Sequence, residues 1–94
     1  MPAFVLAEIT IKDPEVYKQY ASKTPETLQK HGGEFVIRGQ EVKVLEGKWE
    51  EDRLVLLKFE SAEAAQKWYD SEDYQAVRGL RTKASNGRLL LVEV

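Results

Sequence analysis

Residues 68–81, which read WYDSEDYQAVRGLR, carry side chains suited to binding an anion. Ser71 is typical of a helix N-cap, and in a helix that begins there each residue advances about 100° around the axis. Tyr74, Arg78 and Arg81 then share a sector of about 60° beside an apolar stripe. Neighbouring guanidinium groups can hold a carboxylate or an enolate through charge-assisted hydrogen bonds. The pattern indicates a ligand site, and the alternative is a solvated helix face whose arginines pair with nearby acidic residues.

Aromatic and hydroxyl side chains around this segment allow two interpretations. The Ser71 hydroxyl caps the predicted helix and could also face a ligand. The aromatic rings either line a cavity for an aromatic substrate or fill the core between helix and sheet, with their polar tips hydrogen-bonded. These rings belong to Tyr17, Tyr20, Trp49, Trp68 and Tyr69.

Arg38 and Glu46 lie in two segments with the composition of strands. The guanidinium of Arg38 either reaches into a pocket or marks a sheet edge. Glu46 alternates with Val42 and Val44, so its carboxylate is expected to point to the same side as those valines. In a desolvated pocket it would be suited to general base catalysis. The alternative is an ion pair with Arg38 or Arg53.

His31 is the only histidine of the chain and directly precedes Gly32 and Gly33. Imidazole titrates near neutral pH, so His31 is a candidate catalytic acid or base. The alternative is a helix-end residue that interacts with the terminal carbonyls. The chain has no second histidine and no cysteine, so we expect no metal site and no thiolate chemistry.

The composition excludes several classes of protein. The chain has 14 basic and 16 acidic residues, a net charge of −2, which does not favour nucleic-acid binding. No apolar run approaches the roughly 18 residues that a membrane span requires, and the first residues do not resemble a signal peptide. We therefore expect a cytoplasmic protein without membrane or nucleic-acid partners, built as one domain over residues 1–94.

The order of predicted elements is β-α-β-β-α-β, which is typical of a ferredoxin-like α+β fold with an antiparallel sheet. Asp13 and Pro14 are an N-cap and a first helical residue after the strand 4–11, and Pro25 predicts a kink or break in that helix. Residues 34–38 and 42–49 are predicted to be extended, with a bend between them. A strand at 53–60, two helices that start at Ser61 and Ser71, a stop at Asn86 and a strand at 88–94 complete the chain.

The predicted strands are apolar on both faces, unlike a sheet with one wet face. Within residues 4–11, for example, Phe4 and Leu6 point opposite to Val5 and Ala7. Right-handed crossovers place both helical segments on one side, so the other face has no cover within the chain. Because exposed apolar area is unfavourable by about 25 cal/mol per Å², we predict a homodimer that covers this face.

Several segments together resemble the family catalogued as domain of unknown function 1330. They are DPEVYKQY from Asp13, HGGEFVIRG from His31, LEGKW from Leu45, RLVLLKFES from Arg53 and WYDSEDYQAVRGLR from Trp68. The resemblance implies the dimeric α/β-barrel superfamily, in which two ferredoxin-like sheets pack together and each subunit can hold a small ligand between sheet and helices. That superfamily includes cofactor-free monooxygenases, haem-degrading enzymes, isomerases and ligand-binding domains, so the resemblance implies no single reaction. The position of His31 does not favour haem ligation.

The sequence therefore predicts a homodimer that binds a small anionic or aromatic metabolite and requires no cofactor. The expected ligand-binding residues are Arg38, Tyr69, Ser71, Tyr74, Arg78 and Arg81, and the candidate catalytic residues are Glu46 and His31. Either the site catalyses a monooxygenase- or isomerase-like reaction, or the protein is a ligand-binding or structural dimer without catalysis.

Overall fold

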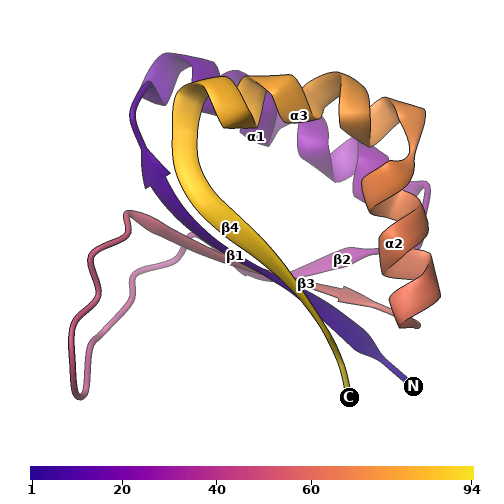
Figure 1. Cartoon of the computed structure of the whole chain (residues 1–94), viewed down its shortest axis with the longest axis horizontal. Coiled ribbons are helices and arrows are strands. Elements are labelled where there is room, and N and C mark those ends of the chain that lie inside the picture. Colours follow the sequence, from indigo (N-terminus) through magenta and orange to yellow (C-terminus); the bar gives the residue numbers. More distant parts are fainter.

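The computed structural model describes the whole chain, residues 1–94. Its elements follow in the order β1 (Ala3–Ile11), α1 (Pro14–Gln29), β2 (Glu34–Arg38), β3 (Arg53–Phe59), α2 (Ala62–Asp70), α3 (Glu72–Ala84) and β4 (Ser85–Glu93). The strands form one antiparallel sheet in the order β2-β3-β1-β4. All helices lie on one side of this twisted sheet (Figure 1). The predicted α+β, ferredoxin-like arrangement is confirmed.

Polar side chains fix where the helices begin. The Asp13 carboxylate accepts a hydrogen bond from the Val16 amide, and Pro14 takes the first helical position of α1. Ser61 and Ser71 cap α2 and α3 in the same way. Such caps satisfy amides that have no partner inside the helix. None of the helices has the length and apolar character needed to span a lipid bilayer.

A kink or a break was predicted at Pro25, and the break does not occur, because α1 continues through Pro25 to Gln29. Proline removes one amide donor from a helix. Packing on both sides of Pro25 outweighs this loss, since Tyr20, Thr24 and Leu28 are all buried. The Thr24 hydroxyl also donates to the Tyr20 carbonyl at 2.7 Å, which adds a bond within the turn before the proline.

The core lies between the helices and one face of the sheet. Alternate residues of β1 point into it and are fully or nearly buried, from Ala3 to Ile9. The inward side chains of β3 pair with them in register, as Val5 does with Leu57. Trp68 of α2 and Tyr74 of α3 close the core from above, and both are at most 1% exposed.

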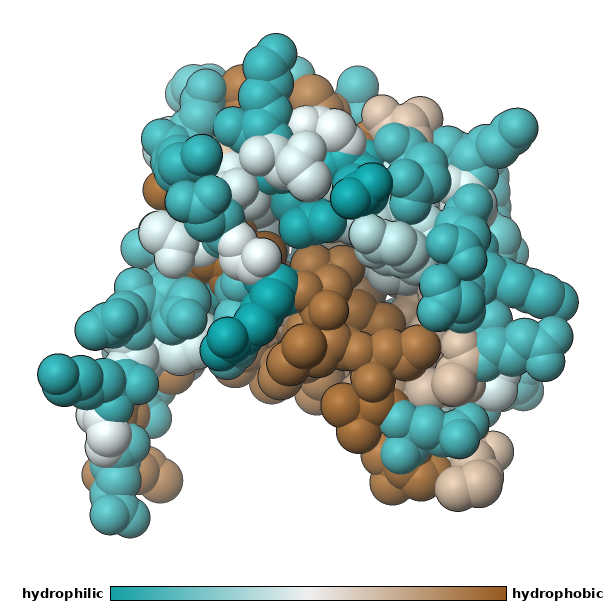
Figure 2. Space-filling view, in the orientation of Figure 1, coloured by the Kyte–Doolittle hydropathy of each residue, from teal (hydrophilic) through white to brown (hydrophobic).

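The opposite face of the sheet carries apolar side chains that no helix covers. Leu6 lies at its centre, between Leu56 of β3 and Leu90 of β4. Leu90 is 43% exposed and Val92 is 51% exposed. We call this surface the uncovered face; it comprises Phe4, Leu6, Leu54, Leu56, Leu90 and Val92. Figure 2 shows hydrophobic surface that extends below the helices towards the free strand ends.

Glu8 interrupts the apolar residues of β1 on the uncovered face. Its carboxylate accepts a hydrogen bond from Arg88, which lies opposite it on β4. The ion pair satisfies the charge within the same chain, and both residues border a shallow polar depression with Thr10 and Glu51. This pair marks the end of the uncovered face at which the apolar residues stop.

The chain between β2 and β3 does not form the predicted strand at residues 42–49. Pairing of β2 with β3 ends at Arg38 and Val55 after an irregularity near Val36. Gly39 then adopts a φ of 76°, which turns the chain out of the sheet and favours glycine. Residues 40–52 extend away from the sheet on the side opposite the helices (Figure 1), and we call them the arm.

The start of β4 also differs from the prediction. Asn86 and Gly87 were expected to end the helical region, but both lie within β4, which begins at Ser85 directly after α3. Asn86 pairs with Thr10 and Gly87 pairs with Ile9 of β1. A side chain at position 87 would collide with the Glu8 carbonyl oxygen and with Ile9. Gly87 therefore permits close strand approach and does not form a turn.

Candidate functional site

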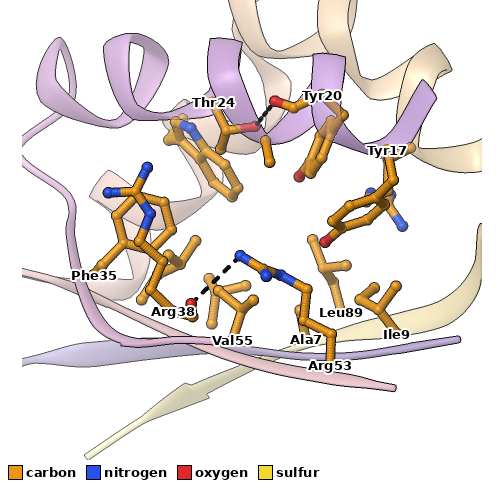
Figure 3. Close-up of a pocket in the computed structure, with 15 residues that line it drawn as sticks. Ala7, Ile9, Tyr17, Tyr20, Thr24, Phe35, Arg38, Arg53, Val55 and Leu89 are labelled. Carbon is orange, nitrogen blue, oxygen red and sulfur yellow. Dashed lines mark hydrogen bonds between the residues drawn. The ribbon is translucent and has the colours of Figure 1, made fainter. Parts of the chain in front are cut away.

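A pocket lies between α1 and the inner face of the sheet (Figure 3). Strands β1 and β3 form its floor with small and branched side chains such as Ala7 and Val55, while Tyr17 and Tyr20 of α1 form its roof. The cavity volume is about 30 Å³. The pocket is therefore narrow and mostly apolar.

Three arginines from three different elements line this pocket, and we call it the arginine pocket. Arg38 is the last residue of β2, Arg53 is the first of β3, and Arg81 comes from the last turn of α3. Because the register places Arg38 opposite Val55, Arg38 lies on the inner face of the sheet. Arg53 shares that face with Val55, two residues further on.

Each of these guanidinium groups has a distinct environment. Arg38 lies over the Phe35 ring, 4.3 Å from its centroid, and Arg53 lies 5.6 Å from the Tyr17 ring centroid. Nη2 of Arg53 donates to the Arg38 carbonyl at 3.5 Å, a long contact at the mouth of the pocket. Figure 3 shows the Arg53 guanidinium extending into the space between floor and roof.

Arg81 is the most deeply placed of the three arginines, with 9% of its surface exposed. Burial disfavours its charge, but the adjacent phenols of Tyr74 and Tyr20 outweigh this and hold the pKa of Arg81 above its ordinary value. Its Nε atom is buried and has no hydrogen-bond partner, as is also true of Nε in Arg53. Two donors beside the pocket are therefore unsatisfied.

No acidic side chain neutralises the arginine pocket. Its lining contains no aspartate and no glutamate. The ion pairs of the chain all lie elsewhere, and none includes Arg38, Arg53 or Arg81. Arg81 is buried, Arg53 is half-buried and Arg38 is exposed. Because a buried charge in a protein is normally paired, the surroundings of Arg81 in particular are electrostatically suited to an anion.

Phenolic hydroxyl groups border the arginines. The hydroxyls of Tyr20 and Tyr74 are hydrogen-bonded at 2.9 Å. Burial, reinforced by Tyr74, raises the pKa of Tyr20 well above its ordinary value. Burial also raises the pKa of Tyr17, against the opposing effect of Arg53. The phenols of Tyr17 and Tyr20 are therefore neutral at physiological pH and can act as hydrogen-bond donors.

The predicted row of Tyr74, Arg78 and Arg81 is divided between two spaces. Only Arg81 lines the arginine pocket, whereas Tyr74 is completely buried behind it and bonds to Tyr20. Arg78 lines a neighbouring cleft between α2, α3 and β4, of about 370 Å³, which Arg81 also borders. Tyr74 places its aromatic ring in the core and is therefore absent from the surface row. Helical spacing alone does not reveal this.

Tyr69 and Ser71 also lie outside the arginine pocket. Tyr69 lines the neighbouring cleft, where Arg78 lies 5.7 Å from its ring centroid. The Ser71 hydroxyl accepts from the Tyr74 amide at 3.3 Å and donates to the Trp68 carbonyl at 2.6 Å. Ser71 thus has the capping position predicted for it, and its hydroxyl is engaged by the backbone.

The two candidate catalytic residues are not brought to the arginine pocket. Glu46 is exposed on the arm and makes no ion pair with Arg38 or Arg53, because the strand that would have carried it does not form. His31 follows the end of α1, where its Nε2 lies 3.8 Å from the Asp73 Oδ1. That contact joins the end of α1 to the first turn of α3.

The sequence did not single out Arg53 as a lining residue, because Arg53 was considered only as an ion-pair partner. Tyr17 and Tyr20 were among the rings for which a cavity wall and the core were both considered, and they serve both roles, since they are buried and line the pocket. One signal was present: Arg53 shares an alternating strand face with Val55, Leu57 and Phe59. An arginine at the end of such a face is expected to reach into whatever space the apolar residues enclose.

Comparison with known families places the whole fold in context. The family described as "Domain of unknown function (DUF1330)" matches residues 2–94. A search of curated proteins gave no match. The resemblance inferred from the five sequence segments is thereby confirmed.

Solved structures with the same fold come from several bacteria. RPA0582 from Rhodopseudomonas palustris, of unknown function, has a TM-score of 0.79 at 20% identity; the match covers 99% of this chain and 82% of that one. SnoaB from Streptomyces nogalater, described as a cofactor-independent oxygenase, has a TM-score of 0.67 at 11% identity, covering 99% and 92%. A dimeric ferredoxin-like protein from Thermobifida fusca has a TM-score of 0.67 at 10% identity, covering 100% and 92%. At these identities the similarity shows a common fold.

Proposed function

This chain belongs to the DUF1330 family, and we propose that it is a homodimer in which each subunit binds a small anionic, aromatic metabolite in the arginine pocket. The observation that carries the proposal is the presence of Arg38, Arg53 and Arg81 around one pocket without an acidic residue. A carboxylate or phenolate would neutralise this charge and accept from the unsatisfied Nε donors. Charge-assisted hydrogen bonds of this kind are about twice as strong as neutral ones.

The shape and lining of the pocket support an aromatic ligand. Tyr17, Phe35 and Trp68 contribute rings to its walls, and the space between them is narrow. Flat rings bury large apolar area and pack favourably against other rings. Since Arg38 and Arg53 lie at the mouth, entry of a ring requires these flexible side chains to move outward. Their return would then bring both guanidinium groups onto the anion.

If the protein is an enzyme, the bound ligand would react in the arginine pocket without a cofactor. Guanidinium groups that stabilise an enolate or phenolate would favour a reaction whose transition state gains negative charge. SnoaB, with a similar fold, is described as a cofactor-independent oxygenase. In such a reaction the arginines would stabilise the negative charge, and the Tyr17 phenol, beside Arg53, would be a candidate proton donor.

Binding without catalysis is the second candidate. The lining of the pocket contains no carboxylate and no imidazole, so it lacks the side chains that most often act as general bases. A protein that only binds its ligand needs no such base. The same arginines would then serve recognition alone.

The proposed dimer rests on the uncovered face of the sheet. Its apolar side chains remain partly exposed in one chain, and contiguous apolar surface of this kind marks an interaction site. A protein of similar fold from Thermobifida fusca is described as dimeric. A second copy seated on this face would leave the arginine pocket, on the opposite face of the sheet, free to bind ligand.

Thermal unfolding in the presence of benzoate, 4-hydroxybenzoate and phenol tests the proposal. A carboxylate at 100 times its dissociation constant should stabilise the protein by about 2.7 kcal/mol, whereas neutral phenol should have a smaller effect. Arg53→Met and Arg81→Met should remove the response to the carboxylates. Lys67→Met, which removes an exposed cation on α2, should retain it.

Two outcomes decide between the alternatives. Equal stabilisation of the parent, Arg53→Met and Arg81→Met proteins by carboxylates would rule out the arginine pocket as the anion site. Oxygen consumption or product formation with a bound phenolic carboxylate would support catalysis, and saturable binding without turnover would support a binding protein.

A further inference from the structure

The arm, residues 40–52, is tied to the sheet only at its ends, where Asp52 bonds to Ile9 and Ile11 and Gln40 accepts from the Arg38 amide. No backbone amide or carbonyl of residues 41–49 forms a hydrogen bond with the rest of the protein. Leu45 is 87% exposed and Val44 is 46% exposed. Irregular loops of this length are uncommon in compact domains and usually have a function.

The arm and the uncovered face lie on the same side of the molecule. Figure 1 shows the arm projecting away from the helices, in the direction in which the free ends of β1 and β4 also extend. In Figure 2 a hollow separates the arm from the hydrophobic surface near those strand ends, and no other part of the chain fills it. A body seated on the uncovered face would therefore lie within reach of the arm.

The charges of the arm favour a protein surface of mixed sign. It carries two lysines, Lys43 and Lys48, and five acidic residues, namely Glu41, Glu46, Glu50, Glu51 and Asp52. A nucleic acid or an anionic membrane would instead require an excess of basic residues. The rim of the uncovered face also carries both signs, since Glu34, Lys58 and Arg88 are exposed there.

Symmetry identifies a second copy of this chain as the partner that fits both features. In a two-fold dimer each subunit uses the same surface, so an arm on one subunit meets a face on the other, and the reverse contact is formed at the same time. The apolar tip of the arm matches the apolar uncovered face. The mixed charges beside the tip match the mixed charges of the rim.

We propose that the arm docks on a second copy of this chain, with Leu45 and Val44 against the edge of the partner's uncovered face. The inference rests on the proposed homodimer and adds a specific interaction to it. Each arm holds the other subunit from the side, and burial of Leu45 supplies part of the free energy of association. The dimer then buries an apolar tip that is exposed in the isolated chain.

Sedimentation equilibrium of the full chain without ligand tests the arm directly. Leu45→Asp should raise the dissociation constant of the dimer at least about tenfold, because burial of a new carboxylate replaces burial of a leucine. Ala76→Asp, which introduces the same charge on the exposed side of α3, should leave that constant unchanged. Circular dichroism of both variants should match that of the parent.

A second measurement follows the arm itself. The chain contains no cysteine, so Leu45→Cys and Ala76→Cys each provide one site for an environment-sensitive fluorophore. Emission from the arm should shift to shorter wavelength as the protein concentration passes through the dimer dissociation constant. Emission from the α3 site should not change.

The outcomes distinguish the arm from the dimer. A parent protein that stays monomeric at all concentrations would overturn both the homodimer and the arm contact. A dimeric parent whose Leu45→Asp variant associates equally well, with no spectral shift at position 45, would overturn the arm contact alone. Neither result bears on anion binding in the arginine pocket, which is measured separately.

Discussion

Arg81 links three features of the site at the scale of single residues. It borders the arginine pocket and the neighbouring cleft, and its charge is adjacent to the hydrogen-bonded phenols of Tyr20 and Tyr74. Arg38 and Arg53 line the same pocket and no carboxylate pairs with Arg81, so both its burial and its neighbours disfavour its charge. The adjacent phenols favour the charged form and outweigh the effect of burial on the pKa of Arg81.

The sequence was sufficient to select Arg38 and Arg81 but not to describe their surroundings. Helical spacing identified Arg81, and strand alternation identified Arg38. Tyr74 appeared to be equivalent to Arg78 and Arg81, because helical spacing gives the direction of a side chain but not how deeply it is buried. Tyr74 is completely buried because Trp68 and Tyr69 lie against its ring, 4.1 Å and 5.7 Å away between centroids.

Tyr20→Phe should reveal the energetic role of the phenol pair. The variant removes the 2.9 Å hydrogen bond and leaves the buried Tyr74 hydroxyl without it, which should cost about 1–3 kcal/mol of unfolding free energy at pH 7. Tyr69→Phe is the control, because the Tyr69 hydroxyl forms no hydrogen bond within the protein and its loss should cost little. Urea unfolding monitored by fluorescence measures both.

The same variant should change the response to alkaline pH. The folded-state pKa of Tyr20 is raised, chiefly by burial, so its stabilising contribution is fully present below about pH 10 and is lost as pH rises further. The parent protein should therefore lose stability above about pH 10 more steeply than Tyr20→Phe. Equal slopes for the two proteins would show that Tyr20 does not titrate differently in the folded state.

Strands and helices were predicted best where local pattern and tertiary packing agree. The predicted strand at residues 34–38 coincides with β2, and β3 differs from its prediction by one residue. Residues 42–49 show a similar alternation of apolar and polar residues but form no strand. Pairing of β3 with the preceding chain ends at Arg38, so residues 42–49 have no strand to pair with. A strand forms only where another strand can pair with it, and the sequence of one segment does not show whether such a strand is available.

Two glycines provide a test of how the elements are held. Gly87→Ala places a methyl group against the Glu8 carbonyl, where β1 and β4 approach each other, and should cost at least about 1–3 kcal/mol. Gly79→Ala places the same group in open space on α3 and should stabilise by about 0.5–1 kcal/mol through helix propensity. Thermal unfolding gives both values, and equal effects of the two substitutions would contradict the assigned contacts.

At the scale of the whole molecule, the two faces of the sheet have different roles. Its inner face supports the helices and the arginine pocket, while its uncovered face and the arm are directed away from them. The two-faced composition of the strands was readable from the sequence, because period-two alternation of apolar residues on both faces is a local property. The direction of the arm was not readable, since it depends on the backbone conformation at Gly39, where the chain leaves the sheet, and at Gly47 within the arm, both of which have a positive φ.

Leu6→Asp tests the homodimer at the centre of the uncovered face. Leu6 lies between Leu56 and Leu90 on neighbouring strands, so association would bury the new carboxylate among apolar side chains without a cationic partner. Desolvation of an unpaired charge costs several kcal/mol, and two-fold symmetry introduces the charge twice. The variant should therefore sediment as a monomer at micromolar concentration while the parent sediments as a dimer.

Ala76→Asp is the matched control for this substitution, because Ala76 lies on the exposed side of α3, away from the uncovered face. There the new carboxylate stays in water, so the dimer should persist. Because Leu6 points away from the arginine pocket, monomeric Leu6→Asp should still be stabilised by 4-hydroxybenzoate, which separates assembly from ligand binding. A Leu6→Asp protein that remains dimeric would mean that association uses another surface. The first candidate is the edge of β4, because that strand has a hydrogen-bonded neighbour on one side only.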